Sequence, residues 1–574
     1  MFAAITDSFR SGPDRAAVIS DIMAGLTVGV IALPLSMALA IASGVAPQHG
    51  LYTAIIAGIA IALSGGSRVN ISGPTAAFVV VLLPVVQDFG LGGLLLSGML
   101  AGLILIVMGV TRLGSLIEIV PYPVTVGFTT GIAVVIATLQ LKDFLGLDIQ
   151  SLDGHYVDKC VTIVSALGTV DWHECLVGGL TFVILWFWPR LHSRIPGHLV
   201  ALAVGALCAW LLGWFSADFS VATLGSRFQY QIDGLVGNGI PPMLPDFEWP
   251  WNLPDASGQP IGISFELLRQ LMPSVITIAM LGAIESLLCA VVADGMSGRR
   301  HNPNDELIGQ GIGNVIIPFF GGIPATAAIA RTAASIKAGA RTPLASVIHS
   351  LFILFSVLLL TEVLAYIPMA SLAALLLIVA WNMSEARHFI RIIRIAPADD
   401  VIVLLMCFFL TVLFDMTVAV SIGMGLAAIL FIRRSIDLAT TTRLSVNHAV
   451  HGEIPPEVMV YDIDGPLFFG SAHKAIKSIA DVLPGVRVVI VDMSEVNMLD
   501  MSAIIAMESI TSMLKKHNVI LIINNLKPRM ILKLRRAGIR LQRGSIYYSR
   551  TLAEALEKAR KVIASDKAAA NPDA

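Results

Sequence analysis

The sequence predicts a polytopic α-helical membrane protein with a small α/β domain near its C-terminal end. Of its 574 residues, 56% are hydrophobic and only 14% are charged, whereas soluble domains carry roughly 25% charged residues. The charges are also uneven, with 32 in the last 140 residues and 46 in the first 434. We therefore expect the first three-quarters to lie in a membrane and the last quarter to be a domain of the soluble type.

The composition excludes several classes of protein. A chain this apolar is not expected to be a soluble enzyme, a disordered scaffold or a disulfide-stapled secreted protein. The net charge of −2 lacks the excess of basic residues that is typical of proteins that bind nucleic acid. The five cysteines are scattered, odd in number and without CxxC spacing, so we expect no metal site. No nucleotide-binding glycine motif is present, and we expect no cofactor.

Apolar runs long enough to cross a bilayer recur along the chain. A spanning helix needs about 20 mostly apolar residues. Such runs begin near Ile22, Leu51, Leu91, Leu116, Cys175, Leu199, Leu268, Leu307, Leu344, Met369, Val401 and Met416. Two further runs, residues 74–86 and 324–336, are shorter and begin with proline. Together they predict fourteen segments within residues 22–433, of which two are too short to cross as complete helices.

Basic residues give these segments an orientation. The two long loops near residues 143–174 and 217–267 contain only Lys159 and Arg227 as basic residues, so we expect them outside the cell. The opposite connections hold Arg68, Arg112, Arg190, Arg194, Arg299, Arg300, Lys337, Arg341, Arg387, Arg391, Arg394, Arg433 and Arg434. We therefore expect a multi-pass protein of the bacterial inner membrane, with its N-terminal segment (residues 1–21) and its C-terminal domain in the cytoplasm.

The two short segments predict an inverted repeat. Residues 72–77 read SGPTAA and residues 322–328 read GIPATAA. Their prolines are 250 residues apart, and the first helices of the two halves begin 246 apart, near Ile22 and Leu268. Seven spans is an odd number, so the second copy enters the membrane upside down. This seven-plus-seven pattern is typical of secondary transporters, whose substrate site lies between broken helices at the membrane midplane.

Each short segment is suited to an anion. Proline fits the first turn of a helix because it has no N–H to leave unpaired. The helix start then offers free backbone N–H groups and a partial positive charge. The alternative is that the two segments are similar by chance, because proline and glycine are common in membrane helices. The flanking spans are separated by nearly the same number of residues as the prolines, which favours the repeat.

Two ionisable side chains, Glu285 and Arg331, lie inside predicted spans. A charge at the bilayer centre costs roughly 2.5–3.5 kcal/mol on insertion scales, and such residues usually mark an ion pathway. We interpret Glu285 as the carrier of a coupling proton, because its apolar neighbours favour the neutral acid. The alternative is that Glu285 and Arg331 pair with each other and only hold the two repeats together.

The C-terminal region alternates short β runs with amphipathic helices from residue 457 to residue 564. We expect a linker at residues 434–456 and a disordered tail at residues 565–574. Residues 458–463 and 467–469 are interpreted as a hairpin, and residues 488–492 and 519–523 as buried strands. Ser502 opens the helix at residues 504–516, as its cap or as a regulatory phosphorylation site, and Asp500 is also able to cap this helix.

The sequence resembles the SulP family of anion transporters over essentially its whole length. The residues that carry the resemblance are 71–77, ISGPTAA, and 321–331, GGIPATAAIAR. The C-terminal region resembles a STAS domain, the module shared with anti-sigma-factor antagonists, whose phosphoacceptor serine matches Ser502. The family implies a core domain, a gate domain and a homodimer. It also implies a STAS domain that docks cytosolic protein partners.

The resemblance also implies the site residues. Carried over by position, the substrate-binding residues are Thr75, Ala76, Ala77, Phe78, Thr326, Ala327, Ala328, Ala330 and Arg331, with Glu285 beside them. Many members have Gln after the first-helix proline and Tyr four residues later, where this chain has Leu35 and Leu39. Sodium-coupled bicarbonate relatives have a hydroxyl residue where this chain has Cys289. The departure at Leu35 and Leu39 resembles the dicarboxylate-transporting members, and Cys289 counts against coupling to sodium.

The function expected from the sequence is proton-coupled uptake of C4-dicarboxylates such as succinate, fumarate or aspartate. The alternatives are a SulP transporter or exchanger of bicarbonate, sulfate or chloride, and a membrane receptor that works mainly through its STAS domain. A receptor has no need of half-helix starts or of Glu285, so the sequence favours transport. No nucleophile and base constellation suggests an enzyme.

Overall fold

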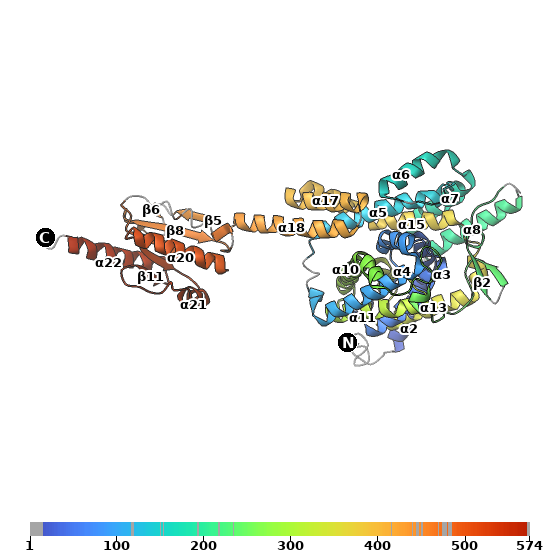
Figure 1. Cartoon of the computed structure of the whole chain (residues 1–574), viewed down its shortest axis with the longest axis horizontal. Coiled ribbons are helices and arrows are strands. Elements are labelled where there is room, and N and C mark those ends of the chain that lie inside the picture. Colours follow the sequence, from blue (N-terminus) through green and yellow to red (C-terminus); the bar gives the residue numbers. More distant parts are fainter. Residues whose placement is uncertain are drawn as a thin grey trace. The chain divides into compact units, whose positions relative to one another are not determined.

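The computed structural model describes residues 15–570 except 116–119, 150, 153, 192–194, 216–218, 233–234, 415, 439, 444–446, 449–451, 469, 473–478 and 480–484. The chain divides into two compact units, Met1–Ala427 and Ala428–Ala574. Figure 1 shows helices throughout the first unit and a sheet flanked by helices in the second. This division agrees with the two regions that charge density predicts.

The first unit is built almost entirely from helices. They are α2 (Arg15–Ala42), α3 (Pro47–Ser64), α4 (Ala76–Val110), α5 (Tyr122–Phe144), α6 (Tyr156–Ser165), α7 (Trp172–Phe187), α8 (Gly197–Phe215), α9 (Leu224–Arg227), α10 (Phe265–Ser297), α11 (Pro303–Ile316), α12 (Ile329–Lys337), α13 (Leu344–Leu359), α14 (Thr361–Leu364), α15 (Met369–Met383), α16 (Ala386–Ile395), α17 (Ala398–Leu413) and α18 (Met416–Leu438), which runs on into the second unit. Two short pairs of strands accompany them, β1 (Ser72–Gly73) with β4 (Thr326–Ala327), and β2 (Gln229–Ile232) with β3 (Leu235–Asn238).

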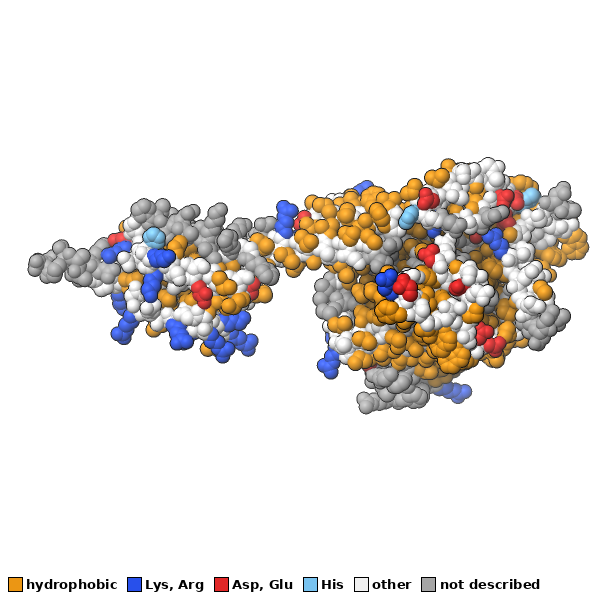
Figure 2. Space-filling model, viewed as in Figure 1, with side chains coloured by type: hydrophobic (Ala, Val, Ile, Leu, Met, Phe, Trp, Pro, Cys, Tyr) orange, Lys and Arg blue, Asp and Glu red, His pale blue; other side chains and the backbone are white. Residues whose placement is uncertain are grey.

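Most of the predicted membrane segments fall on these helices. The segment predicted from Leu116 begins outside the described residues, and the one at residues 324–336 begins before α12. Among the described residues, eight helical stretches are long and apolar enough to cross a membrane. α4 contains both the short segment predicted at residues 74–86 and the span predicted from Leu91. The two parts meet at Gly90, whose backbone is not helical. Gly90 has φ 69°, a left-handed value that costs glycine little, and a Cβ there would lie 2.3 Å from the backbone of Asp255. Figure 2 shows hydrophobic side chains over much of the visible surface of this unit.

The helices of the first unit pack in two groups. In one group, α4 packs on α10 and α11, and α13 packs on α2 and α3. In the other, α5 packs on α15 and α17, and α7 packs on α8 and α15. Each group draws helices from both halves of the chain, which is the arrangement expected of a core domain and a gate domain. Both half-helix segments belong to the first group.

The second unit holds a five-stranded sheet. Its strands are β5 (Thr440–Arg443), β8 (Val458–Asp464), β9 (Val488–Asp492), β10 (Ile520–Asn524) and β11 (Ile546–Ser549), in the order β11-β10-β9-β8-β5. The four later strands are parallel, and β5 joins β8 antiparallel. The helices α20 (Met501–Lys516) and α21 (Pro528–Arg536) cover one face, and α22 (Leu552–Ala570) covers the other. Alternate residues of β9 face the two layers, which confirms the predicted α/β domain.

Three details differ from the expectation. The predicted hairpin is wrong, because β8 pairs with β5 and β9 while Leu467 forms a bridge with Leu499. The expected linker contains β5 as well as the short pair β6 (Asn447–His448) and β7 (Gly452–Glu453). α22 continues to Ala570, into the expected tail, because three alanines there favour helix.

Candidate functional site

The two short segments meet through a pair of strands. β1 and β4 are antiparallel, with Ser72 opposite Ala327 and Gly73 opposite Thr326. α4 begins directly after β1, and α12 begins directly after β4. The starts of two helices from opposite halves of the chain therefore lie side by side, as the repeat predicts.

The equivalence of the two prolines is wrong. Pro74 follows β1, whereas Pro324 precedes β4, and α12 begins only at Ile329. The residues before the two helices, Thr75 and Ala328, are 253 apart (328 − 75) rather than 250. Pro324 instead fills an extended connection, because the side chain of Asn314 holds Ala325 through both its N–H and its carbonyl oxygen, each at 2.8 Å.

Neither helix start is capped by the side chain of the residue before it. Thr75 and Ala328 precede α4 and α12 with extended backbone, and neither accepts a side-chain hydrogen bond from the first turn among the described residues. Ser264, in contrast, caps α10, and Asn302 caps α11. The first N–H groups of a helix have no partner within it, so two buried, uncapped helix starts are a place for an anion.

Arg331 lies between the two helix starts. It is the second residue after Ile329 in α12, and its side chain is buried, with 2% exposure. One guanidinium nitrogen, Nη2, donates to the carbonyl oxygen of Pro74 at 2.5 Å. Nε and Nη1 have no hydrogen-bond partner among the described residues. Because buried polar groups are almost always paired, these two donors indicate a ligand or water.

Glu285 lies on α10 and faces the same loop. Its Oε2 accepts a hydrogen bond of 3.0 Å from the hydroxyl of Thr75. Glu285 and Arg331 are close enough to interact electrostatically, but no direct hydrogen bond or ion pair joins these two described residues. The two side chains therefore do not bond to each other directly; each contacts one of two consecutive residues, Pro74 and Thr75.

The other residues carried over from the family surround this point. Thr75, Ala76, Ala77, Phe78, Thr326 and Ala327 are buried, Ala328 is partly buried and Ala330 is exposed. The hydroxyl of Thr326 donates to the carbonyl oxygen of Gly282 at 3.1 Å, which ties β4 to α10. The structure thus brings Thr75, Glu285, Thr326 and Arg331 to the paired strands β1 and β4, whereas Ala330 is exposed.

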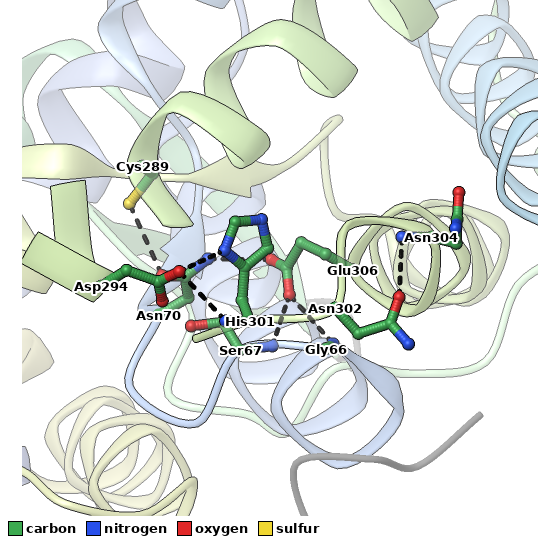
Figure 3. Close-up of polar contacts among 9 residues, drawn as sticks. All are labelled: Gly66, Ser67, Asn70, Cys289, Asp294, His301, Asn302, Asn304 and Glu306. Carbon is green, nitrogen blue, oxygen red and sulfur yellow. Dashed lines mark hydrogen bonds and ion pairs between the residues drawn. The ribbon is translucent and has the colours of Figure 1, made fainter. Parts of the chain in front are cut away.

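Sequence reasoning missed a polar cluster beside this site. Glu306 of α11 is 1% exposed and accepts hydrogen bonds from Gly66, Ser67, Asn70 and Gln310. Figure 3 shows part of this cluster. A signal was present, because Glu306, Gln310 and Asn314 recur every four residues and so share one face of the helix.

A buried histidine was missed as well. His349 of α13 is 0% exposed, and neither of its ring nitrogens has a hydrogen-bond partner among the described residues. Like Arg331, His349 is therefore a buried side chain with unsatisfied polar atoms.

A cavity lies between the two groups of helices. It has a volume of about 490 Å³ and is lined by the end of α2, the first part of α4 and the end of α5, with Arg227 at its rim. Lys142 and Asp143 also line it, and Asp143 forms an ion pair with Arg227 at 3.6 Å. The cavity does not include the helix starts, but it lies along the same half-helix that leads to them.

The N-terminus of α20 differs from the expectation for Ser502. Asp500, not Ser502, is the N-cap, because its carboxylate accepts from the N–H of Ala503 at 2.8 Å. Ser502 is the second residue of the helix and is partly exposed. A carboxylate at this position also interacts favourably with the helix dipole.

Comparisons with known proteins agree with this geometry. Residues 18–406 match the sulfate permease family, and residues 450–555 match the STAS domain. The chain is similar to the putative sulfate transporter YvdB of Bacillus subtilis (strain 168), with 39% identity over 520 residues, 90% of this chain and 93% of that protein. It is 30% identical to the bicarbonate transporter BicA of Picosynechococcus over 511 residues, 85% of each chain.

Solved structures share the fold. The transmembrane domain of a cyanobacterial bicarbonate transporter BicA covers 72% of this chain and 98% of its own length, with a TM-score of 0.60 and 29% identity. The murine anion transporter Slc26a9 covers 98% of this chain and 94% of its own, with a TM-score of 0.82 and 17% identity. With the family match over more than half its length, this chain belongs to the sulfate permease family, as an anion transporter with a C-terminal STAS domain and not as an enzyme.

Proposed function

We propose that this transporter carries small carboxylate anions together with protons, and that its substrates are C4-dicarboxylates such as succinate, fumarate or aspartate. The observation that carries the proposal is the buried guanidinium of Arg331, with two unpaired nitrogens between two uncapped helix starts. Guanidinium groups bind carboxylates through paired, charge-assisted hydrogen bonds. The half-helix starts add backbone N–H donors, as in other transporters with broken helices.

The charge of this site fits a dianion. Arg331 contributes one positive charge, and each helix start contributes about half a charge. With Glu285 protonated, the sum is about +2, which a dicarboxylate would neutralise. With Glu285 ionised, the sum falls to about +1, so binding of a dianion favours the protonated acid. Substrate and proton would then bind cooperatively, each favouring the other by the same free energy.

Protons suit this site better than sodium. Hard cations such as the alkaline-earth ions prefer oxygen ligands, and sodium shares this preference. The thiol of Cys289, one turn after Glu285, contacts the Thr332 hydroxyl at 3.3 Å and the Asn70 amide oxygen at 3.8 Å. This position therefore offers sulfur instead of an oxygen ligand, which supports a proton as the coupling ion.

Transport of an inorganic anion is the second candidate. It is favoured by the relatives, since one is a putative sulfate transporter and another is a bicarbonate transporter. The choice of a dicarboxylate over an inorganic anion rests on Leu35 and Leu39, which are apolar residues where many members of the family carry Gln and Tyr. Leu39 is buried with 2% exposure, so it offers no polar contact of that kind.

Uptake into proteoliposomes tests the proposal. Purified full-length protein would be given labelled succinate, fumarate, aspartate, bicarbonate or sulfate, in sodium-free buffer, with and without an inward proton gradient. We expect accumulation of dicarboxylates that requires the gradient. Accumulation of sulfate or bicarbonate alone would establish the second candidate, and uptake that requires sodium would contradict proton coupling.

The placement in the cell is also part of the proposal. The basic residues of the short connections support an inner-membrane protein with its N-terminus and STAS domain in the cytoplasm. We place a homodimer and a cytosolic protein partner of the STAS domain in the same proposal, with Ser502 as a regulatory position on the docking face. Accessibility of single cysteines to a membrane-impermeant reagent would test the orientation.

A further inference from the structure

The connection that leads into β1 is held by one buried carboxylate. Glu306 Oε2 accepts from the backbone N–H groups of Gly66 and Ser67 at 3.0 and 2.9 Å. Its Oε1 accepts from the side-chain amides of Asn70 and Gln310 at 2.9 and 3.1 Å. Figure 3 shows Glu306 directed toward Gly66 and Ser67. All four donors are neutral, and three of them belong to the connection between α3 and β1.

The connection that leads into β4 is held in the mirrored way. On α3, a ring nitrogen of His49 lies 2.6 Å from the carbonyl oxygen of Gly321, and the hydroxyl of Thr53 donates to the carbonyl oxygen of Ile323 at 3.0 Å. On α11, Gln310 donates to the hydroxyl of Ser72 at 3.0 Å. The two pairs are related by one offset, because 306 − 49 and 310 − 53 both equal 257.

This reciprocity follows the repeat. α3 and α11 pack on each other, and each uses two polar residues one turn apart, near its own start, to hold the connection that follows the other helix. The packing is too tight for these connections to slide. A Cβ at Gly66 would lie 2.2 Å from the Asn302 carbonyl oxygen, and one at Gly309 would lie 2.4 Å from the Cα of Gly65.

The held connections determine where the substrate site lies. One ends at β1 and the loop that Arg331 and Glu285 contact, and the other ends at β4 and the start of α12. Since β1 and β4 pair with each other, a shift of either connection moves both helix starts. Such a shift would move the backbone N–H donors of both helix starts away from a bound anion.

We propose that Glu306 and His49 are positioning residues, which set the two helix starts of the substrate site from opposite ends of the helix pair α3 and α11. This inference rests on the proposed location of the site, but not on the identity of the anion. Neither side chain contacts Arg331 or Glu285 among the hydrogen bonds of the described residues, so both act through the backbone of the connections.

Glu306→Gln tests the role of the carboxylate. Glutamine keeps the shape but replaces one acceptor oxygen with a donor nitrogen, which then faces a donor of Gly66 and Ser67 or of Asn70. We expect the KM for uptake to rise about tenfold or more, with the maximal rate per correctly folded transporter changed less than twofold, because ground-state and transition-state binding are lost together. The pH profile of uptake should keep its wild-type shape, since Glu285 is untouched.

Thr181→Ala is the matched control for a purely structural effect. Thr181 of α7 is 0% exposed, and its hydroxyl bonds to that of Ser371 on α15 at 2.8 Å, within the other group of helices. Its removal should lower thermal stability without changing the KM of the folded protein. A wild-type KM in Glu306→Gln with a reduced melting temperature would overturn the proposal and leave Glu306 a structural residue. If Glu306→Gln fails to insert, Asn70→Ala, which removes one of the four donors, is measured in its place.

The mirrored residue gives an independent measurement. His49→Leu should raise the KM as Glu306→Gln does, and His49→Gln, whose amide can still donate to Gly321, should restore most of the affinity. The double variant should show a smaller rise in KM than the product of the two single effects, because both connections end in one strand pair. Independent, multiplicative effects, or failure of the glutamine rescue, would contradict positioning through β1 and β4.

The choice of labelled anion separates the test of the positioning role from the test of the proposed substrate. KM is measured with whichever labelled anion the wild-type protein accumulates, whether succinate, sulfate or bicarbonate. If the wild type transports no dicarboxylate, the proposed substrate is wrong, and the effect of Glu306→Gln on the KM for the true anion still decides the positioning role.

Discussion

Glu285 and Arg331 are joined through two consecutive residues of one loop and not by a direct ion pair. Thr75 donates to the carboxylate of Glu285, and Pro74 accepts from the guanidinium of Arg331. A direct pair would satisfy both charges and leave little affinity for an anion. In the observed arrangement, Nε and Nη1 of Arg331 have no partner among the described residues, so the guanidinium stays free to bind an anion.

Removal of the Arg331 side chain should weaken substrate binding most. Arg331→Ala deletes the only positively charged side chain observed between the helix starts in the described residues, and a hydrogen bond to a charged group is worth about 1.5–3 kcal/mol. We expect the dissociation constant to rise at least about tenfold. Arg341→Ala is the control, because this side chain is exposed. Binding measured by scintillation proximity in detergent gives the comparison, and equal, small effects of both would refute the role of Arg331.

Loss of the Glu285 carboxylate should separate binding from coupling. Glu285→Gln resembles the protonated acid in shape and charge and can still contact the hydroxyl of Thr75. We expect substrate to bind while uptake driven by a pH gradient is lost, with exchange of labelled for unlabelled substrate retained. Accumulation against a concentration gradient in this variant, at wild-type pH dependence, would show that another group carries the proton.

A methyl group at Gly73 should disturb Arg331. A Cβ at Gly73 would lie 2.7 Å from Arg331 Nη1, so Gly73→Ala should displace the guanidinium and raise the dissociation constant for substrate about tenfold, the loss of about 1.4 kcal/mol. Gly179→Ala on α7 is the matched control, since nothing lies within 4 Å of its added methyl group. If both variants bind substrate equally well, Arg331 does not need the close approach that glycine allows.

The capping of α20 gives a prediction for the STAS domain. Asp500→Ala removes the cap that bonds to the N–H of Ala503, and we expect a loss of about 1 kcal/mol in the stability of this domain. Ser502→Ala should cost far less, because Ser502 is not the cap. Thermal unfolding monitored by a probe in the STAS domain of the full-length protein measures both. The reverse ranking would return the cap to Ser502.

A charge at Ser502 tests its regulatory role separately. A phosphate would add about −1.5 to −2 charge at the N-terminus of α20, on a partly exposed residue. Ser502→Asp should change the affinity of a STAS partner or the rate of uptake, whereas Ser509→Asp, on the exposed part of the same helix, should not. Unchanged uptake and partner binding in Ser502→Asp would remove Ser502 from the proposed function.

The sequence alone determined the class of the protein and the neighbourhood of its site. Long apolar runs predict spanning helices because burial in lipid depends on local hydropathy. Glu285 and Arg331 could also be identified from the sequence. A charge inside an apolar run is costly, so such a residue is a candidate for function. The repeated SGPTAA and GIPATAA segments located the two helix starts to within a few residues.

Only the tertiary structure decided which atoms meet. The start of α12 lies past Pro324 because Asn314 and the pairing with β1 hold the preceding residues extended. Glu306 stabilises the connection after α3 across 240 residues of sequence, and Asp500 takes the cap that Ser502 also fits. Each choice is a competition between hydrogen-bond partners that become neighbours only when the helices pack, so no local pattern of residues contains it.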